Sequence, residues 1–289
     1  MTGAAVEAPL VELGVSGGLR EVAQRRFLLG LLVRKELRVR YRSSVLGLGW
    51  SYVKPAVQFL VYFLAMGLIL KQGSIGNYAV YLFGGLVVVT SFSEAVGNAT
   101  RSIVANADLV KKIYLPRELF PVASLSVSAV HLAPQLVVLV VGALVSGWRP
   151  DVVGLAALVV ALVLVFLLAL GAGLLLAALN VFFRDVENVV DLVLMVLVWV
   201  SPVLYSWQRV ADVLGHRSWV LALYQANPLT VAVELMHRAT WWGSPSANAE
   251  ALPPGLWTSA SVALVVAMIV LWTGQAAFRA LSGRFAQEL

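Results

Sequence analysis

Six long apolar stretches, separated by short polar segments, constrain this chain more than any other feature. A helix needs about 20 mainly apolar residues to cross the hydrocarbon core of a membrane. Backbone groups in lipid must be satisfied within the segment, and runs of Leu, Val and Ala without alternation favour helices over barrel strands. We therefore expect an all-α integral membrane protein. Its six predicted transmembrane helices cover 51–70, 78–96, 122–145, 152–181, 189–206 and 257–277.

The composition supports lipid as the main solvent and excludes several classes of protein. Of 289 residues, 60% are hydrophobic and 12% are charged, whereas soluble domains carry about 25% charged residues. Cysteine is absent, which excludes disulfides and cysteine-based metal or redox sites. No lysine follows a glycine, so the sequence contains no P-loop. It also contains no HExxH motif, the zinc-binding signature of many metalloproteases. We expect no catalytic residue, no metal and no cofactor in this chain, and no nucleic-acid partner.

The distribution of Lys and Arg orients the predicted helices. With the N-terminus in the cytoplasm, sixteen of the 21 Lys and Arg residues lie on the inner side, as the positive-inside rule requires. Both termini are then cytoplasmic. We expect an N-terminal tail at 1–19, an amphipathic segment at 20–49 and a single transmembrane domain at 50–289.

The segment before the first predicted span is strongly basic and partly apolar. Eight basic residues between positions 20 and 42 alternate with apolar ones, which favours a helix lying in the membrane interface. Ordinary flanking charge is the alternative. Arg38, Arg40 and Arg42 end this segment, and guanidinium groups bind phosphate through paired donors. The cluster predicts either a lipid-phosphate site or simple anchoring, and Ser43 and Ser44 suit a helix break or a plain loop.

Two further features lie within the spans. Tyr52, Phe59, Tyr62 and Phe63 fall near one face of the first span, where they can either contact sugar rings or pack helices. Ionisable residues are scarce, which disfavours an ion-coupled transporter. Glu94 and Asp191 are expected toward span ends. His131 alone lies deep, and we expect it to bond a neighbour rather than relay protons.

A short charged piece, "DLVKKIYLPRELFP", separates the second and third spans on the cytoplasmic side. A short amphipathic helix with exposed Ile113, Tyr114 and Leu115 suits a groove on another protein, although a connecting loop is the alternative. Arg184 and Asp185 lie at the inner end of the fourth span. They form either a local ion pair or contacts to a cytoplasmic partner.

The outer segment at about 207–256 is long and rich in tryptophan. Within it, "SWVLALYQANPLTVAVELMH" contains two apolar stretches divided by Asn227-Pro228. Proline disfavours helix in the residue before it and suits the first turn of the next helix. Both stretches are too short to span a membrane, so we expect two re-entrant or interfacial helices, with an external subdomain as the alternative.

Taken in order, four motifs resemble the permease subunit of polysaccharide-exporting ABC transporters, over residues 20–280. They are "RKELRVRYRSSVLGLGWSYVKP", "VKKIYLPRELFP", "LNVFFRDVENVVDLVL" with "WVSPVLYS", and "NPLTVAVELMHRATW". This family exports O-antigen, teichoic acid, galactan and related polymers. The resemblance implies the type II ABC exporter fold, with six spans, an N-terminal interface helix, a cytoplasmic coupling helix and external re-entrant gate helices.

The resemblance also implies location and partners. The chain is expected in the bacterial inner membrane as a homodimer, and each copy is expected to bind one separate ATPase subunit that holds ATP and Mg. The implied substrate is a polysaccharide on a polyprenyl diphosphate lipid, moved from the inner leaflet outward. A permease for drugs or small lipids shares the fold, and a membrane-embedded glycosyl- or acyltransferase is a further class, although no catalytic residues cluster for it.

The same resemblance assigns roles to particular residues. The lipid diphosphate is expected at Arg38, Arg40, Tyr41, Arg42, Ser43 and Ser44. The translocation path is expected along Trp50, Tyr52, Phe59, Tyr62 and Phe63. The coupling helix at about 107–115 and its surroundings contribute Asp108, Leu109, Lys111, Lys112, Ile113, Tyr114, Arg117, Arg184 and Asp185. The external gate at about 207–256 contributes Trp219, Tyr224, Asn227 and Pro228.

Overall fold

A computed structural model describes residues 18–42, 44–45, 47–70, 75–113, 115–215, 218–244 and 252–289. Every regular element in these residues is a helix, as the apolar runs predict. The tail at 1–17 lies outside the described residues, and so do Ser43 and Tyr114.

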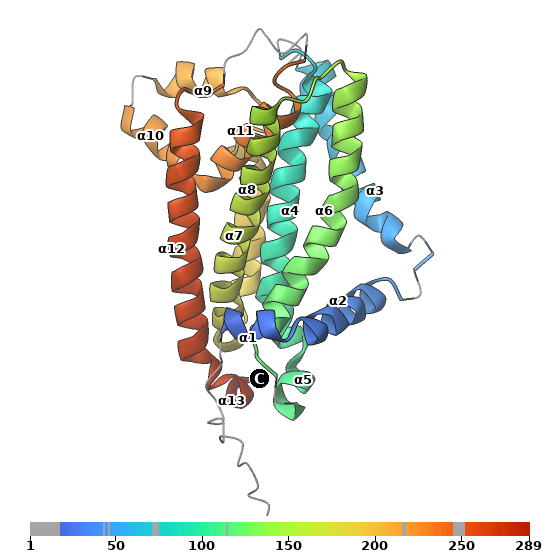
Figure 1. The fold of residues 1–289 in the computed structure, drawn as a ribbon, viewed down its shortest axis with the longest axis vertical. Helices are drawn as coiled ribbons and strands as arrows, with labels where there is room; N and C mark the ends of the chain where they lie inside the picture. Colours follow the sequence, from blue (N-terminus) through green and yellow to red (C-terminus); the bar gives the residue numbers. More distant parts are fainter. Residues whose placement is uncertain are drawn as a thin grey trace, which may run out of the picture.

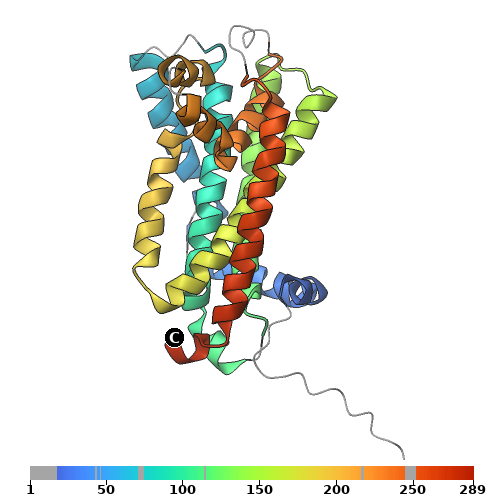
Figure 2. The same ribbon diagram turned by 90° about the vertical axis from the view of Figure 1, so that its left-hand side faces the viewer.

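Five helices in the described part of the chain are long and apolar enough to cross a membrane. Figures 1 and 2 show the four longest running side by side as a bundle. The fifth is α3, which continues as the π-helical turn η2 and lies beside the bundle in Figure 1. Their bounds are α3 Trp50–Tyr62 with η2 Phe63–Ile69, α4 Tyr78–Ala105, α6 Leu119–Val145, α7 Val152–Phe182 and α12 Leu256–Ser282.

The fifth predicted span, 189–206, corresponds to a helix that is shorter than the sequence indicates. Helix α8 covers Val186–Val200, which is 15 residues, or about 22 Å against a hydrocarbon core of about 30 Å. The chain then turns at Ser201. Two buried tyrosines of α4 hold this turn, because the Tyr81 hydroxyl donates to the Pro202 carbonyl at 3.0 Å and the Tyr78 hydroxyl donates to the Leu204 carbonyl at 3.1 Å.

Close packing of α7 against α12 depends on two glycines. A Cβ atom at Gly274 would lie 2.1 Å from the carbonyl oxygen of Gly171, and one at Gly171 would lie 2.5 Å from the amide nitrogen of Leu271. Small residues allow helix backbones to approach in a membrane, where association depends on van der Waals packing. These two glycines therefore fix how α12 lies on α7.

The predicted break at Asn227-Pro228 separates two short helices. They are α10 Ser218–Ala226 and α11 Pro228–Thr240. The Asn227 side chain caps α11 by accepting a hydrogen bond from the Leu229 amide at 3.0 Å, which satisfies one unpaired amide of the first turn. Helix α11 is mostly buried in the core shared with α4 and α7, whereas α9, Trp207–Leu214, and α10 lie at one end of the molecule in Figure 1.

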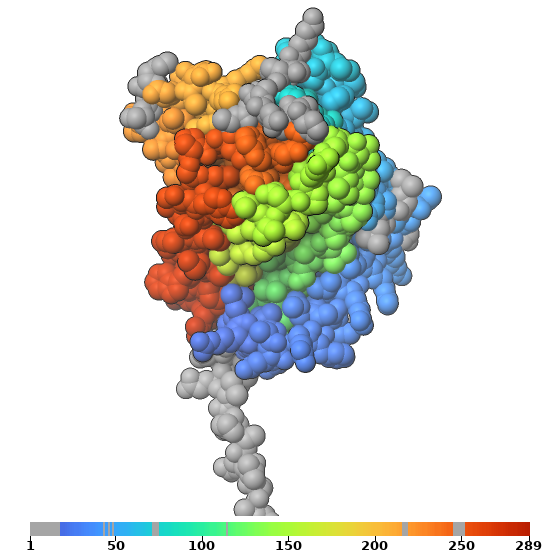
Figure 3. Space-filling model, turned by 45° about the horizontal axis from the view of Figure 1, so that its top comes forward, coloured from blue at the N-terminus to red at the C-terminus, as the bar shows by residue number. Residues whose placement is uncertain are grey.

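The basic N-terminal segment forms two helices, α1 Leu19–Gln24 and α2 Arg26–Arg40. Helix α2 lies across the foot of α6 rather than parallel to it, and it forms part of the surface in Figure 3. No residue of α2 is fully buried, and Phe27 and Val39 are exposed. The chain continues to α3 through the short 3-10 turn η1 at Gly47–Gly49.

The segment predicted to be the coupling helix lies at the end of the molecule opposite α9 and α10 (Figures 1 and 2). It forms α5, Ala107–Lys112, which is shorter than the predicted 107–115 because Ile113 adopts an extended backbone. The C-terminal helix α13, Phe285–Glu288, lies beside α5. This end therefore combines the predicted coupling helix with the C-terminal helix α13.

Candidate functional site

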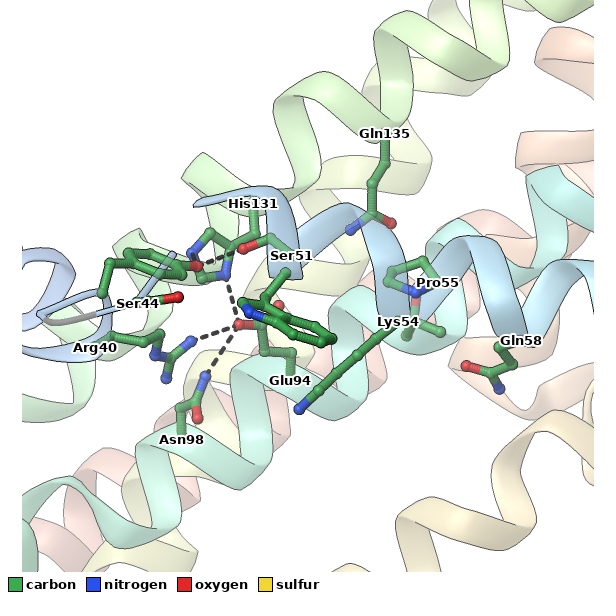
Figure 4. A pocket seen from close by; sticks show the side chains of 13 residues that line it. Arg40, Ser44, Ser51, Lys54, Pro55, Gln58, Glu94, Asn98, His131 and Gln135 are labelled. Atoms are coloured by element: carbon green, nitrogen blue, oxygen red, sulfur yellow. Dashed lines mark hydrogen bonds and ion pairs between the residues drawn. The ribbon is translucent and has the colours of Figure 1, made fainter. Parts of the chain in front are cut away.

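A polar cavity of about 610 Å³ lies where the end of α2, the start of α3, α4 and α6 meet. Figure 4 shows its lining side chains. Charged and amide side chains are unusual at this depth in an apolar bundle, because unpaired charges are costly in lipid. The lining residues are Arg40, Tyr41, Ser44, Trp50, Ser51, Lys54, Pro55, Gln58, Thr90, Glu94, Asn98, His131 and Gln135.

The carboxylate of Glu94 is the centre of the site. Its Oε1 atom accepts from Arg40 Nη1 at 2.8 Å, from His131 Nδ1 at 2.6 Å and from Asn98 Nδ2 at 3.4 Å. These three bonds are drawn as dashed lines in Figure 4. Arg40 ends α2 and His131 belongs to α6, so one carboxylate oxygen of α4 joins three helices.

His131 extends this network toward the loop before α3. A carboxylate only accepts hydrogen bonds, so the Nδ1 atom facing Glu94 carries the proton. The Nε2 atom lies 2.8 Å from the Tyr41 hydroxyl, which also contacts the Ser51 hydroxyl. His131 is 3% exposed, and the neighbours that it bonds are the side chains of Glu94 and Tyr41.

Helix α4 is longer than the predicted span that contains Glu94. The apolar run predicts a span that ends at 96, whereas α4 continues to Ala105. The Glu94 side chain lines the cavity, and its expected place toward a span end stays a prediction.

Lys54 and Gln135 bring unused hydrogen-bonding capacity to the cavity. In Figure 4 the Lys54 side chain extends from α3 toward Glu94 and Asn98. Within the described residues, Lys54 forms no hydrogen bond or ion pair. Gln135 is 6% exposed, and its Oε1 atom has no partner in the part of the chain that the structure covers. The cavity therefore surrounds one carboxylate with two cations and open polar atoms.

A polar track continues from this cavity along one face of α4. A second cavity, of about 500 Å³, shares Thr90, Glu94 and Asn98 with the first and is also lined by Arg101 and Asp191. The track residues recur every three or four positions, which places them on one helix face. Arg101 forms an ion pair with Asp191 of α8, so the track extends to the space between α4 and α8.

The structure separates the predicted basic cluster. Arg40, Tyr41 and Ser44 line the cavity, and so does Trp50. Arg38 and Arg42 are exposed and do not line it. Only one of the three arginines therefore faces the polar cavity.

The aromatic residues of the first span mostly pack against neighbours. Phe59 stacks on Phe63 with ring centroids 5.7 Å apart and meets Phe83 edge to face at 5.5 Å. Tyr62 lines the second cavity. Tyr52 is exposed and lies outside the lining of both cavities. Phe59 and Phe63 therefore pack against neighbouring rings, whereas Tyr62 is the one of these four aromatic residues that lines a cavity described above.

The end of the molecule that carries α5 presents a small charged hollow of about 250 Å³ beside that helix. Lys111, Lys112 and Ile113 line it and are exposed, and so is Asp108, whereas Leu109 is half-buried. The Arg117 guanidinium lies 5.7 Å from the ring centre of Phe285 in α13, which is within cation–π distance. Arg184 and Asp185 are exposed between α7 and α8, and no ion pair joins them in the described chain.

The opposite end has a more apolar hollow of about 540 Å³, lined in part by Tyr224, Asn227 and Pro228. Trp219 is 71% exposed. Nearby, Arg238 of α11 forms a two-pronged ion pair with Asp151, with N–O distances of 3.0 and 2.6 Å. This hydrogen bonding to Arg238 holds the pKa of the Asp151 carboxyl below its usual value.

Sequence reasoning left several cavity residues without a role, namely Lys54, Gln58, Asn98 and Gln135. A signal was present for the α4 residues. Thr90, Glu94, Asn98 and Arg101 are spaced three or four residues apart, which places them on one face of α4. The residues on α3 and α6 carry no such pattern, because their proximity depends on how the helices pack.

Several membrane-spanning helices around a polar cavity define a multi-pass membrane protein. Residues 28–240 match the ABC-2 type transporter model, so this chain belongs to the ABC-2 type transporter membrane family.

Similar proteins cover most of the chain. The O-antigen export system permease protein RfbA of Myxococcus xanthus is 31% identical over 94% of this chain and 98% of its own length. A Klebsiella pneumoniae protein of the same name is 30% identical over 70% of this chain and 75% of its length. The polysialic acid transport protein KpsM of Escherichia coli is 22% identical over 73% of this chain and 80% of its length.

Proposed function

We propose that this chain is the membrane subunit of an ATP-driven exporter of lipid-linked polysaccharide. Similarity to the Myxococcus xanthus O-antigen export permease over almost the whole length of both chains carries the proposal. The polar cavity and the track along α4 support it, because a hydrophilic polymer needs a polar route through an apolar bundle. The substrate class is a polysaccharide of O-antigen, galactan or teichoic-acid type on a polyprenyl diphosphate.

The proposed topology has six spans in the bacterial inner membrane, with both termini in the cytoplasm. Helix α8 and the turn after it form the fifth span, α1 and α2 lie in the inner interface, and α10 and α11 re-enter from outside. The burial of α11 against the bundle supports re-entry. The domain division follows, with a tail at 1–19, an interface segment at 20–49 and the transmembrane domain at 50–289.

The proposed assembly is a homodimer that closes the polar track. No residue of α3 is fully buried, and α8 exposes Leu192, Val193, Met195 and Val196. These two helices flank the track, which holds charged residues that lipid would not accommodate. A two-fold partner packed on α3 and α8 covers this surface and encloses a path between the copies.

Each copy binds one ATPase subunit through α5 and the adjoining hollow, so the complex contains two ATPase copies. ATP and Mg belong to that partner, and the permease has no catalytic role of its own. The exposed Lys111, Lys112 and Ile113 support this docking face, as do Arg117, Arg184 and Asp185 at the same end. The relatives are named for polysaccharide rather than drug transport, which disfavours a drug or small-lipid permease.

The test is co-purification of the full chain with its ATPase in lipid nanodiscs, followed by measurement of ATP turnover. We expect a two-plus-two complex whose turnover changes when glycan linked to polyprenyl diphosphate is added. Glycan without the lipid diphosphate is the control. A chain that purifies without any ATPase, or a turnover rate that ignores the lipid-linked glycan, contradicts the proposal.

A further inference from the structure

We infer that the Glu94 carboxylate competes with a diphosphate ligand for Arg40. It pairs with the Arg40 guanidinium until a diphosphate group binds Arg40 in its place. The identity of that group as the head of a lipid-linked substrate rests on the proposed function. The displacement itself rests on the arrangement of Arg40, Lys54, Glu94 and His131 around the cavity.

Arg40 has donors to spare for a second anion. A guanidinium group carries five N–H donors in a planar fork that matches phosphate oxygens. Arg40 uses one nitrogen, Nη1, in its bond to Glu94, and its side chain remains 36% exposed. The bond therefore leaves most of the fork available to an incoming phosphate.

Lys54, on α3, provides a second cation to the lining of the cavity. Figure 4 shows its side chain extended toward the space beside Glu94. Within the residues described, it has no acid to neutralise it. Two cations against one carboxylate leave the pocket with excess positive charge, which suits a group that carries more than one negative charge.

Glu94 does not become unpaired when Arg40 is taken away. Its Oε1 atom keeps the bonds from His131 Nδ1 at 2.6 Å and Asn98 Nδ2 at 3.4 Å. A buried charge left without partners would cost several kcal/mol, so these remaining donors make the exchange feasible. His131 in turn stays bonded to Tyr41, in the loop that leads to α3.

The exchange breaks a direct link between α2 and α4. Helix α4 is separated from the coupling helix α5 by the single residue Asn106. A ligand that removes the Arg40–Glu94 bond therefore breaks one of the links between α2 and α4, while the Lys35 side chain of α2 still donates to Asn106. Glu94 thus makes the docking end of the chain sensitive to occupation of the cavity.

The test measures anion binding to the full chain in nanodiscs, without the ATPase. Inorganic pyrophosphate is titrated by calorimetry, and binding of polyprenyl diphosphate is measured by native mass spectrometry. Polyprenol without phosphate is the control ligand. Arg34→Gln is the matched control variant, because Arg34 is exposed on α2 and does not line the cavity.

Glu94→Gln is expected to tighten diphosphate binding at least about fivefold, because the internal competitor is gone. Arg40→Gln and Lys54→Gln are each expected to weaken it about tenfold, since each removes a charged hydrogen bond. Arg34→Gln should change the diphosphate affinity by less than about twofold, which is a difference of less than about 0.4 kcal/mol in binding free energy. If Glu94→Gln does not fold, Asn98→Asp adds a carboxylate beside Arg40 and must weaken binding.

A folded Glu94→Gln protein whose affinity for diphosphate is unchanged or lower overturns the inference, because Glu94 then only joins helices and does not compete with the ligand. The inference is also overturned if binding of the phosphate-free polyprenol responds to the same variants. If the variants change the affinity for both pyrophosphate and polyprenyl diphosphate, the site recognises the diphosphate group alone. If they change only the affinity for polyprenyl diphosphate, recognition also needs the lipid in the membrane. Because no ATPase or glycan is present, this result stands apart from the export test.

Discussion

At the scale of single residues, the position of a side chain around its helix decides its role. Arg38 and Arg40 are two residues apart, which corresponds to about 200° around an α-helix. Arg40 therefore faces the cavity while Arg38 faces away, and Arg42 lies beyond the helix end at Tyr41. The sequence showed a basic cluster, but it did not show which member meets Glu94.

The Tyr41 hydroxyl connects His131 and Ser51, so its removal should weaken the contact between the α3 loop and α6. Tyr41→Phe is expected to lower the free energy of unfolding by about 1 kcal/mol, the usual net value of one hydrogen bond. Tyr52→Phe is the matched control, because Tyr52 is exposed and lies outside this network. Equal stabilities of the two variants in thermal unfolding in detergent would show that the network contributes nothing.

The Asp151–Arg238 pair gives a pH dependence with a defined sign. The pKa of Asp151 is lowered from 3.8 by Arg238, so the pair stabilises the fold above the unfolded pKa and loses that effect as pH falls through the folded value. The pair is partly exposed, so Asp151→Asn should cost about 0.5–1 kcal/mol at pH 7.

The difference between wild type and Asp151→Asn should shrink toward zero as the pH falls below 3.8 and through the lower folded pKa of Asp151. Unfolding midpoints measured at pH 7 and in acid check this. Asp212→Asn, an exposed aspartate on α9 without an ion pair in the described chain, is the control and should show no such trend. A gap that widens in acid would contradict the assignment.

At the scale of elements, backbone contact between α7 and α12 is the most demanding feature of the bundle. Gly274→Ala places a methyl group 2.1 Å from the Gly171 carbonyl oxygen, so the helices must separate. We expect a loss of about 1–3 kcal/mol, as for other overpacked sites. Unfolding in a denaturing detergent measures it.

Gly142→Ala in α6 is the control for that variant, because a Cβ at Gly142 has no neighbour within 4 Å. It should be neutral or stabilising by up to about 1 kcal/mol, since alanine is the better helix former. If Gly274→Ala is as stable as Gly142→Ala, the close approach of α7 and α12 is not a structural requirement.

At the scale of the whole molecule, the two ends of the bundle are specialised differently. Helices α5 and α13 with α1 form the basic end, and α9 with α10 form the other. Ile113→Asp places a charge on the proposed docking face, where Ile113 is exposed, and is expected to reduce ATPase co-purification at least about tenfold. Thermal stability of the isolated chain should be unchanged.

Val213→Asp is the matched control, since Val213 is 69% exposed on α9 at the opposite end. It should leave ATPase capture intact. Capture that is lost equally in both variants would point to misfolding rather than to a docking face.

The sequence by itself determined the helical class, the order of the helices and the break at Asn227-Pro228, because apolar run length and proline act locally. It did not determine that α4 continues past Val96 to Ala105 or that α8 ends after 15 residues. Those limits depend on partners from other segments, such as the tyrosines that hold the turn after α8. The cavity was also decided by tertiary structure alone, because Arg40, Glu94 and His131 belong to three helices that meet only in the folded bundle.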